Sequence, residues 1–185
     1  RIKARPFWDH KQTGFAFVGC GLYLGALCLA VFGGSARALS GDSALPLLTL
    51  CSVIMGLGLA LEGFGLVLHA RDMNRAESEG AVSHYVQKTT FGKTWLARNV
   101  LLAITAVALL CGPFYLGETY GFAVWAVCAV AALLVAIVGR ALFYVLVIPT
   151  TMPGAFFWKN KGFEQHARDI GLAEMPQVGV VPLKH

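Results

Sequence analysis

Long runs of apolar residues, separated by short polar stretches, dominate the pattern along the chain. Four such runs lie at about 14–34, 46–68, 95–117 and 121–148, each bounded by Gly, Pro or charged residues. Each run has at least the roughly 20 residues that an α-helix needs to cross a hydrocarbon core of about 30 Å. The pattern therefore predicts an all-α integral membrane bundle with four transmembrane helices.

The apolar runs divide the chain into three parts. Residues 1–13 form a basic segment, residues 14–148 form the transmembrane domain, and residues 149–185 form a polar tail. The fourth run is longer than one crossing requires, so we expect this helix to tilt or to leave the membrane while still helical. Pro149 and Pro153 then end it, because proline cannot continue the helical hydrogen-bond pattern.

The tail cannot bury a core of its own, because it is short and largely polar. It contains one expected short helix, at about 163–170, followed by an extended stretch with Pro and Val. Either the tail docks on a partner subunit through Phe163, His166 and Arg168, or it remains loose; both interpretations are open.

Basic residues are distributed unevenly, and their distribution predicts the orientation in the membrane. Twelve of the 15 Lys and Arg residues lie before the first run, between the second and third runs, or in the tail, whereas Arg37 alone lies in the other two loops. By the positive-inside rule, both ends and the long loop are expected on the cytoplasmic side. The net charge of +5 is therefore expected to belong to one face of a membrane protein.

The composition excludes several classes of protein. Of the 185 residues, 57% are apolar and only 14% are charged, whereas soluble proteins average about 25% charged residues. This balance excludes a large soluble catalytic domain, a disordered chain, a disulfide scaffold and a nucleic-acid-binding protein, and membrane lipids are the expected surroundings. The five Cys form no Cys-x-x-Cys pair and no two His lie at matching depth inside the runs, so neither a metal site nor haem is expected in this chain.

Two of the runs are rich in glycine at helical spacing, which permits close packing of helices in a membrane. These glycines are Gly21 and Gly25 in the first run, and Gly56, Gly58, Gly63 and Gly65 in the second. Tight packing of these helices with each other or with a partner is their expected role.

Glu62 is the only acidic residue inside the second run and the strongest single indication of a functional site. A carboxylate at bilayer depth must be neutralised, paired or hydrated, because hydrocarbon does not solvate a charge. Helical spacing places Glu62 on one face with Gly65 and His69. Arg140 lies at a similar depth in the fourth run, and Arg98 lies somewhat shallower in the third.

Three interpretations of Glu62 are open. It forms a buried ion pair with Arg140 or Arg98 that only fixes helix packing, it acts with His69 in a proton path or in the wall of a quinol site, or it is simply protonated in place. Two interpretations are also open for Arg98, Arg140 and Tyr144. They orient a quinone head group or a lipid phosphate, or they only extend toward the membrane interface.

Three local sequences resemble the C-terminal half of the membrane anchor subunit of dimethyl sulfoxide reductase-type molybdoenzymes, the DmsC family. They are Arg5-Pro-Phe-Trp, Leu96-Ala-Arg-Asn-Val-Leu-Leu and Gly139-Arg-Ala-Leu-Phe-Tyr, of which the Gly-Arg-x-x-Phe-Tyr pattern is the most specific. The resemblance covers about residues 1–150.

This resemblance implies one half of an eight-helix anchor in the bacterial inner membrane. Such an anchor exchanges electrons between the quinone pool, menaquinone or ubiquinone, and an iron–sulfur subunit, which serves a molybdopterin catalytic subunit. The iron–sulfur clusters and the molybdopterin then belong to the partner subunits, and the cytoplasmic orientation is similar to that of the sulfite-oxidising relatives. Two alternatives are a structural or assembly membrane subunit without a redox role, and a small transporter in which Glu62 couples transport to protons.

Overall fold

The computed structural model describes residues 10–74, 84, 87–118, 120–145 and 169. The four long helices are α1 (Lys11–Leu39), α2 (Leu45–Met73), α4 (Gly92–Leu110) and α6 (Gly121–Val145), and the short α5 (Gly112–Tyr115) precedes α6. Each long helix is sufficiently long and apolar to cross a membrane. The prediction of an all-α bundle with four such helices is confirmed, which makes the chain a multi-pass membrane protein.

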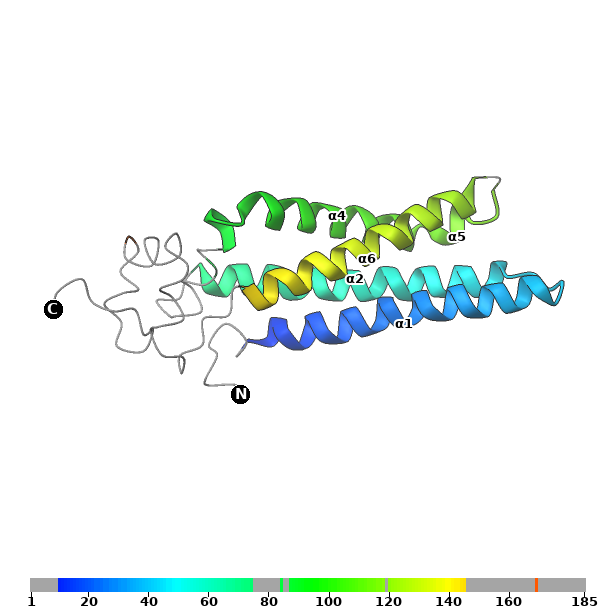
Figure 1. The fold of residues 1–185 in the computed structure, drawn as a ribbon, viewed down its shortest axis with the longest axis horizontal. Helices are drawn as coiled ribbons and strands as arrows, with labels where there is room; N and C mark the ends of the chain where they lie inside the picture. Colours follow the sequence, from blue (N-terminus) through cyan, green and yellow to red (C-terminus); the bar gives the residue numbers. More distant parts are fainter. Residues whose placement is uncertain (1–9, 75–83, 85–86, 119, 146–168, 170–185) are drawn as a thin grey trace.

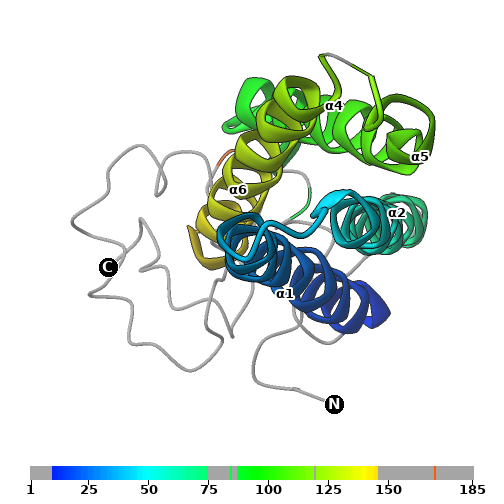
Figure 2. The same cartoon turned by 90° about the vertical axis from the view of Figure 1, so that its right-hand side faces the viewer.

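The four long helices lie side by side along the long axis of the molecule (Figure 1). α1 and α2 form an antiparallel pair, α4 packs on α2, and α6 crosses diagonally from α5 toward α1 (Figure 2). One end of the bundle contains the beginnings of α1 and α4 and the ends of α2 and α6. We call it the basic end, because Lys11, Arg71, Lys88 and Lys93 belong to it.

Two glycines permit the close packing of α1 on α2. A Cβ atom added to Gly58 would lie 2.7 Å from the carbonyl oxygen of Gly19 and 2.9 Å from the backbone nitrogen of Tyr23. Neither backbone atom can give way without moving its helix. At Gly21 and Gly25, by contrast, an added Cβ would meet no atom within 4 Å, so Gly19 makes the close approach from α1.

The third predicted span, 95–117, is divided in the structure. α4 ends at Leu110, and the chain turns at Cys111 before α5 begins. Pro113 lies in the first turn of α5, where its missing N–H is not needed, whereas it would interrupt a helix continuing from α4. The first two spans are longer than their apolar runs, since α1 and α2 comprise 29 residues each.

Side chains from all four long helices meet in a dense core. The largest fully buried members are Tyr23, Met55, Leu59, Leu109 and Val135. Large apolar side chains also cover the outer faces of the helices, as expected for a bundle surrounded by lipid and not by water.

Some predicted features lie outside the described residues. These are residues 1–9 of the basic segment, the end of the fourth span at 146–148, and the whole tail apart from Asp169, including the predicted docking residues Phe163, His166 and Arg168.

Candidate functional site

A buried ion pair joins α2 to α4 inside the bundle. Arg98 Nη2 donates a hydrogen bond to Glu62 Oε1, and both side chains are more than nine-tenths buried. Arg98 Nη1 donates a second hydrogen bond, of 3.0 Å, to Asn99 Oδ1. Of the two cations predicted as partners of Glu62, the structure therefore pairs Arg98 with it, and not Arg140.

Gly139 of α6 allows a third helix to pack against this pair. A Cβ atom at Gly139 would lie 2.7 Å from Arg98 Nη2 and 3.2 Å from Arg98 Nε. The guanidinium thus occupies the space that a side chain at this position would fill. This contact gives a physical role to the glycine that precedes Arg140 in the sequence.

Arg140 itself has a different neighbour. Its guanidinium carbon lies 4.0 Å from the centre of the Phe17 ring on α1, a cation–π contact between α6 and α1. Tyr144, one turn further along α6, is 61% exposed, and its ring contacts that of Phe143. The structure therefore does not bring Tyr144 to the ion pair.

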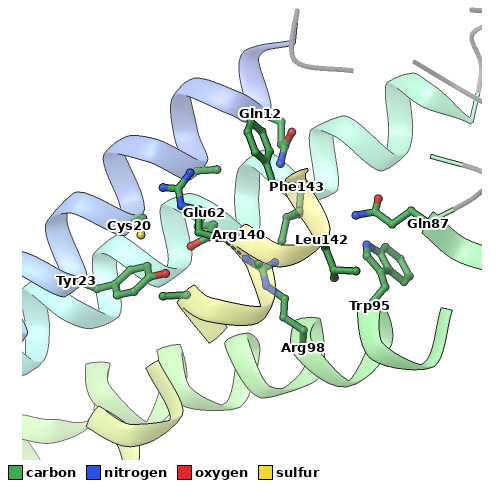
Figure 3. A pocket seen from close by; sticks show the side chains of 14 residues that line it. Gln12, Cys20, Tyr23, Glu62, Gln87, Trp95, Arg98, Arg140, Leu142 and Phe143 are labelled. Carbon is green, nitrogen blue, oxygen red and sulfur yellow. Dashed lines mark hydrogen bonds and ion pairs between the residues drawn. The ribbon is translucent and has the colours of Figure 1, made fainter. Parts of the chain in front are cut away.

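A small polar cavity lies beside the ion pair, lined by side chains from α1, α2, α4 and α6 (Figure 3). Its polar lining includes Gln12, Tyr23, Glu62, Arg98 and Arg140. The space for water-sized groups is about 30 Å³, enough for a water molecule but well below the roughly 300 Å³ at which ligand pockets begin. Among the described residues, Gln12 Oε1, the Tyr23 hydroxyl, Glu62 Oε2 and Arg98 Nε have no hydrogen-bond partner, so this lining suits bound water.

A larger groove lies between α4 and α6 and is open toward the outside of the bundle. Its volume is about 450 Å³, which is within the range of small-molecule sites. Aliphatic side chains such as Leu101, Leu134 and Val138 form most of its surface, while Lys93 and Arg98 are its basic residues. Arg98 therefore lines both the polar cavity and the apolar groove.

His69 belongs to a third feature, a row of aromatic rings at the basic end. The ring centre of His69 lies 4.9 Å from that of His10 and 5.4 Å from that of His84, and His84 lies 6.2 Å from Trp95. His10 also caps α1, since its Nδ1 accepts a 3.0 Å hydrogen bond from the backbone nitrogen of Gln12. We call His10, His69 and His84 the histidine row.

His84 lies outside the membrane-spanning helices, yet it is almost completely buried. Burial lowers the pKa of its imidazole, and the positive charge of Lys88 lowers it further. His84 is therefore neutral at neutral pH. In the part of the chain that the structure describes, no three His, Cys, Asp or Glu side chains are arranged to hold a metal ion.

Sequence reasoning identified Glu62, His69 and Arg98 but missed several of their neighbours. Tyr23 and Gln12 on α1 line the cavity, and His10 and His84 extend the contacts of His69. The available signal was that a His lies near the polar end of each of three different segments. Because these segments are separate, no single helical period relates the three positions.

Comparison of the sequence with protein-family models, with curated proteins and with solved structures gives no match. The site consists of a buried ion pair that adjoins a water-sized cavity and an apolar groove.

Proposed function

We propose that this chain is a membrane anchor subunit of a molybdopterin oxidoreductase complex, which exchanges electrons between the quinone pool and an iron–sulfur subunit. The observation that carries the proposal is the position of Arg98, which lines both an apolar groove between α4 and α6 and a polar cavity shared with Glu62. The family resemblance of the Gly139-Arg140 segment adds to it, since Gly139 packs against Arg98.

Quinone chemistry explains why these two environments would lie together. Reduction of a quinone to a quinol takes up two electrons and two protons, whereas oxidation of the quinol releases them. The quinone ring is flat and apolar and reaches its site through the bilayer, so it requires an apolar groove that is open to lipid. Its carbonyl oxygens require a donor such as the Arg98 guanidinium, and its protons require a carboxylate such as Glu62.

The same proposal assigns roles to the groove, the basic end and the tail. The quinone, menaquinone or ubiquinone, would occupy the groove with its head group toward Arg98. The partner subunits, with their iron–sulfur clusters and molybdopterin, would dock on the basic end, which we place on the cytoplasmic side of a bacterial inner membrane because of its Lys and Arg residues. The tail residues Phe163, His166 and Arg168 would contribute to that docking.

Purification from native membranes tests the complex. An iron–sulfur protein and a molybdopterin protein are expected to copurify with the chain, as identified by mass spectrometry and metal analysis. A stable homo-oligomer without such partners would contradict the proposal.

A matched pair of variants on one face of α6 tests the quinone site. Leu134→Trp fills the groove, whereas Val127→Trp places the same ring two turns away on the lipid-exposed surface. Photolabelling with azido derivatives of ubiquinone and of menadione is expected to mark α4 and α6 in the wild type and in Val127→Trp, but not in Leu134→Trp. Equal labelling of both variants would place the quinone elsewhere.

One observation favours a second candidate, a structural subunit without a redox role. Glu62 and Arg98 already neutralise each other, and an ion pair that joins two helices needs no ligand. Replacement of Glu62 by Gln distinguishes the two functions. Normal assembly with lost quinol turnover supports the quinone site, whereas lost assembly with normal turnover per assembled complex supports the structural role.

A further inference from the structure

The guanidinium of Arg140 lies at membrane depth, and within the part of the chain that the structure describes no group accepts a hydrogen bond from it. Arg98 donates to Glu62 and Asn99, whereas Arg140 lies over the Phe17 ring, with its guanidinium carbon 4.0 Å from the ring centre. An aromatic face attracts a cation, but it does not satisfy five N–H donors. Because arginine stays charged in proteins, this group needs an anion or water from its surroundings.

The charges around Arg140 do not cancel. The cavity that it lines contains two arginines, Arg98 and Arg140, and one carboxylate, Glu62. Arg98 already binds that carboxylate, which can neutralise only one of the two guanidinium groups. Figure 3 shows the two arginines reaching the cavity from different helices, α4 and α6. One positive charge therefore remains in a region where hydrocarbon cannot solvate it.

Arg140 is close enough to one membrane surface to reach lipid head groups. At a rise of about 1.5 Å per residue, it lies roughly 7.5 Å before Val145, where α6 ends. The side chain is only partly buried, and an arginine can extend over such a distance toward the interface. Because α6 ends at the basic end of the bundle, the phosphate groups of that leaflet are the anions within reach.

The side chains around Arg140 form an outer surface that suits a lipid. Tyr144, one turn nearer the basic end, is 61% exposed, and Ile137, one turn deeper, is 64% exposed. Phe17 of α1 is 48% exposed and lies against the guanidinium. We call Phe17, Ile137, Arg140 and Tyr144 the α1–α6 surface. Its polar groups lie nearer the basic end and its apolar groups lie deeper, which is the order of groups along a phospholipid.

We propose that the α1–α6 surface binds an anionic phospholipid from the leaflet at the basic end. The guanidinium of Arg140 donates two parallel hydrogen bonds to the phosphate, and the Tyr144 hydroxyl donates a third. The acyl chains cover Phe17 and Ile137. The lipid carries a net negative charge, as phosphatidylglycerol does, because the phosphate of a zwitterionic lipid is already compensated by its own ammonium group.

This inference goes beyond the proposed function and does not depend on it. The groove assigned to quinone is lined by Leu134 and Val138, whereas Arg140 and Tyr144 lie on a different face of α6. The bound lipid connects α6 to α1 through Arg140 and Phe17, so it is expected to support the packing of these two helices.

Native mass spectrometry of the full chain tests the lipid site. The chain in detergent is mixed with equal amounts of phosphatidylglycerol and phosphatidylcholine of different mass, and the ratio of the two singly bound forms is measured. The wild type is expected to prefer phosphatidylglycerol, and Arg140→Gln is expected to reduce this preference about fivefold. Arg71→Gln is the matched control, because it removes an exposed charge from α2 at the same end of the bundle, and it should retain the wild-type preference.

A second variant tests the site independently of how well Arg140→Gln folds. Tyr144→Phe retains the ring that contacts Phe143 but removes the hydroxyl donor, so a loss of about threefold in the preference is expected. Millimolar inorganic phosphate distinguishes a lipid from a free anion. It should leave phosphatidylglycerol bound, because it has no acyl chains to cover the apolar part of the surface.

Three outcomes would overturn the lipid site. A wild type without preference for phosphatidylglycerol would mean that water alone solvates Arg140. Equal losses in Arg140→Gln and Arg71→Gln would indicate a general attraction of the basic end for anionic lipids. Displacement of the lipid by inorganic phosphate would indicate a site for a free anion. None of these measurements involves quinone or a partner subunit, so the failure of the lipid site and the failure of the proposed function are distinguishable.

Discussion

Three groups contact the guanidinium of Arg98 closely, each from a different side. Glu62 and Asn99 accept its hydrogen bonds, and the backbone of α6 at Gly139 packs against a third side. Because hydrocarbon does not solvate charge, the position of this group depends on all three neighbours. Single substitutions around this guanidinium should therefore change the free energy of unfolding by more than the size of the substituted group suggests.

Gly139→Ala tests the contact between α6 and the guanidinium. The new methyl group would lie 2.7 Å from Arg98 Nη2, so either the guanidinium or α6 must move. We expect a loss of about 1–3 kcal/mol in the free energy of unfolding, measured by titration with denaturing detergent. Gly25→Ala is the matched control: its methyl group would meet no atom within 4 Å, and a gain of stability from helix propensity is expected. Equal effects of the two variants would contradict a packing role for Gly139.

The ion pair is tested by a double-mutant cycle. Glu62→Met or Arg98→Met leaves one buried charge without its partner, and each is expected to reduce the free energy of unfolding by about 3–5 kcal/mol. The double variant leaves no charge behind and should cost less than either single variant. Melting temperatures in mild detergent provide the measurement. Additive losses would mean that the two residues act independently.

Only part of this site could be predicted from the sequence. Glu62 stands out because it is the one acidic residue in an apolar run, and its depth selects Arg98 and Arg140 as partners. Depth along a helix, however, does not determine the rotation of that helix. The crossing of α6 turns Arg140 toward Phe17 and leaves Arg98 to pair with Glu62, which requires knowledge of the packed bundle. His10 and His84 were missed for the same reason, because packing alone brings their segments to His69.

At the scale of the helices, apolar runs locate the elements well and their ends less well. Charged and amide residues at the beginning of α1 and at the end of α2 remain helical, because backbone hydrogen bonding does not require an apolar side chain. The third apolar run extends beyond the end of α4, because the chain stays apolar through Gly112 and Pro113, where the helix is broken. Apolarity therefore reports membrane depth, whereas the Gly112-Pro113 pair determines where α4 ends.

Gly58→Ala tests the pairing of α1 with α2. The added methyl group would lie 2.7 Å from the carbonyl oxygen of Gly19, so the two helices would have to separate. We expect a loss of about 1–3 kcal/mol in the free energy of unfolding, since packing and not the hydrophobic effect holds helices together in lipid. Gly21→Ala on the open side of α1 is the control and should retain the wild-type stability. An unchanged free energy of unfolding in Gly58→Ala would mean that α1 and α2 pack less closely in the membrane.

At the scale of the whole molecule, the uneven charge distribution predicts one orientation in the membrane. The turn between α1 and α2 should face away from the cytoplasm, and the basic end should face it. In a background without native cysteines, Ser43→Cys in this turn should react with an impermeant maleimide added to intact cells. Lys88→Cys at the basic end should react only after the membranes are opened. The reverse pattern would move the partner subunits to the other side of the membrane.

The stability of the whole molecule should also depend on pH through His84. Burial and Lys88 hold the pKa of this imidazole below its ordinary value in the folded chain, whereas in the unfolded chain it returns to about 6.5. Below that pH the unfolded state binds more protons than the folded state, so the free energy of unfolding falls as the pH is lowered. Above it, His84 is neutral in both states and contributes no pH dependence.

Two variants separate the causes of this dependence. His84→Gln removes the titrating group, so its melting temperature should fall less between pH values of about 7.5 and 5.5 than that of the wild type. Lys88→Met removes the nearby positive charge, which raises the pKa of His84 toward its ordinary value and should also reduce the loss at acidic pH. Arg37→Met, at the opposite end of the bundle, removes a positive charge that does not face His84 and should leave the wild-type slope. If all three variants kept that slope, the acid sensitivity would arise elsewhere, and His84 would be protonated without cost to the fold.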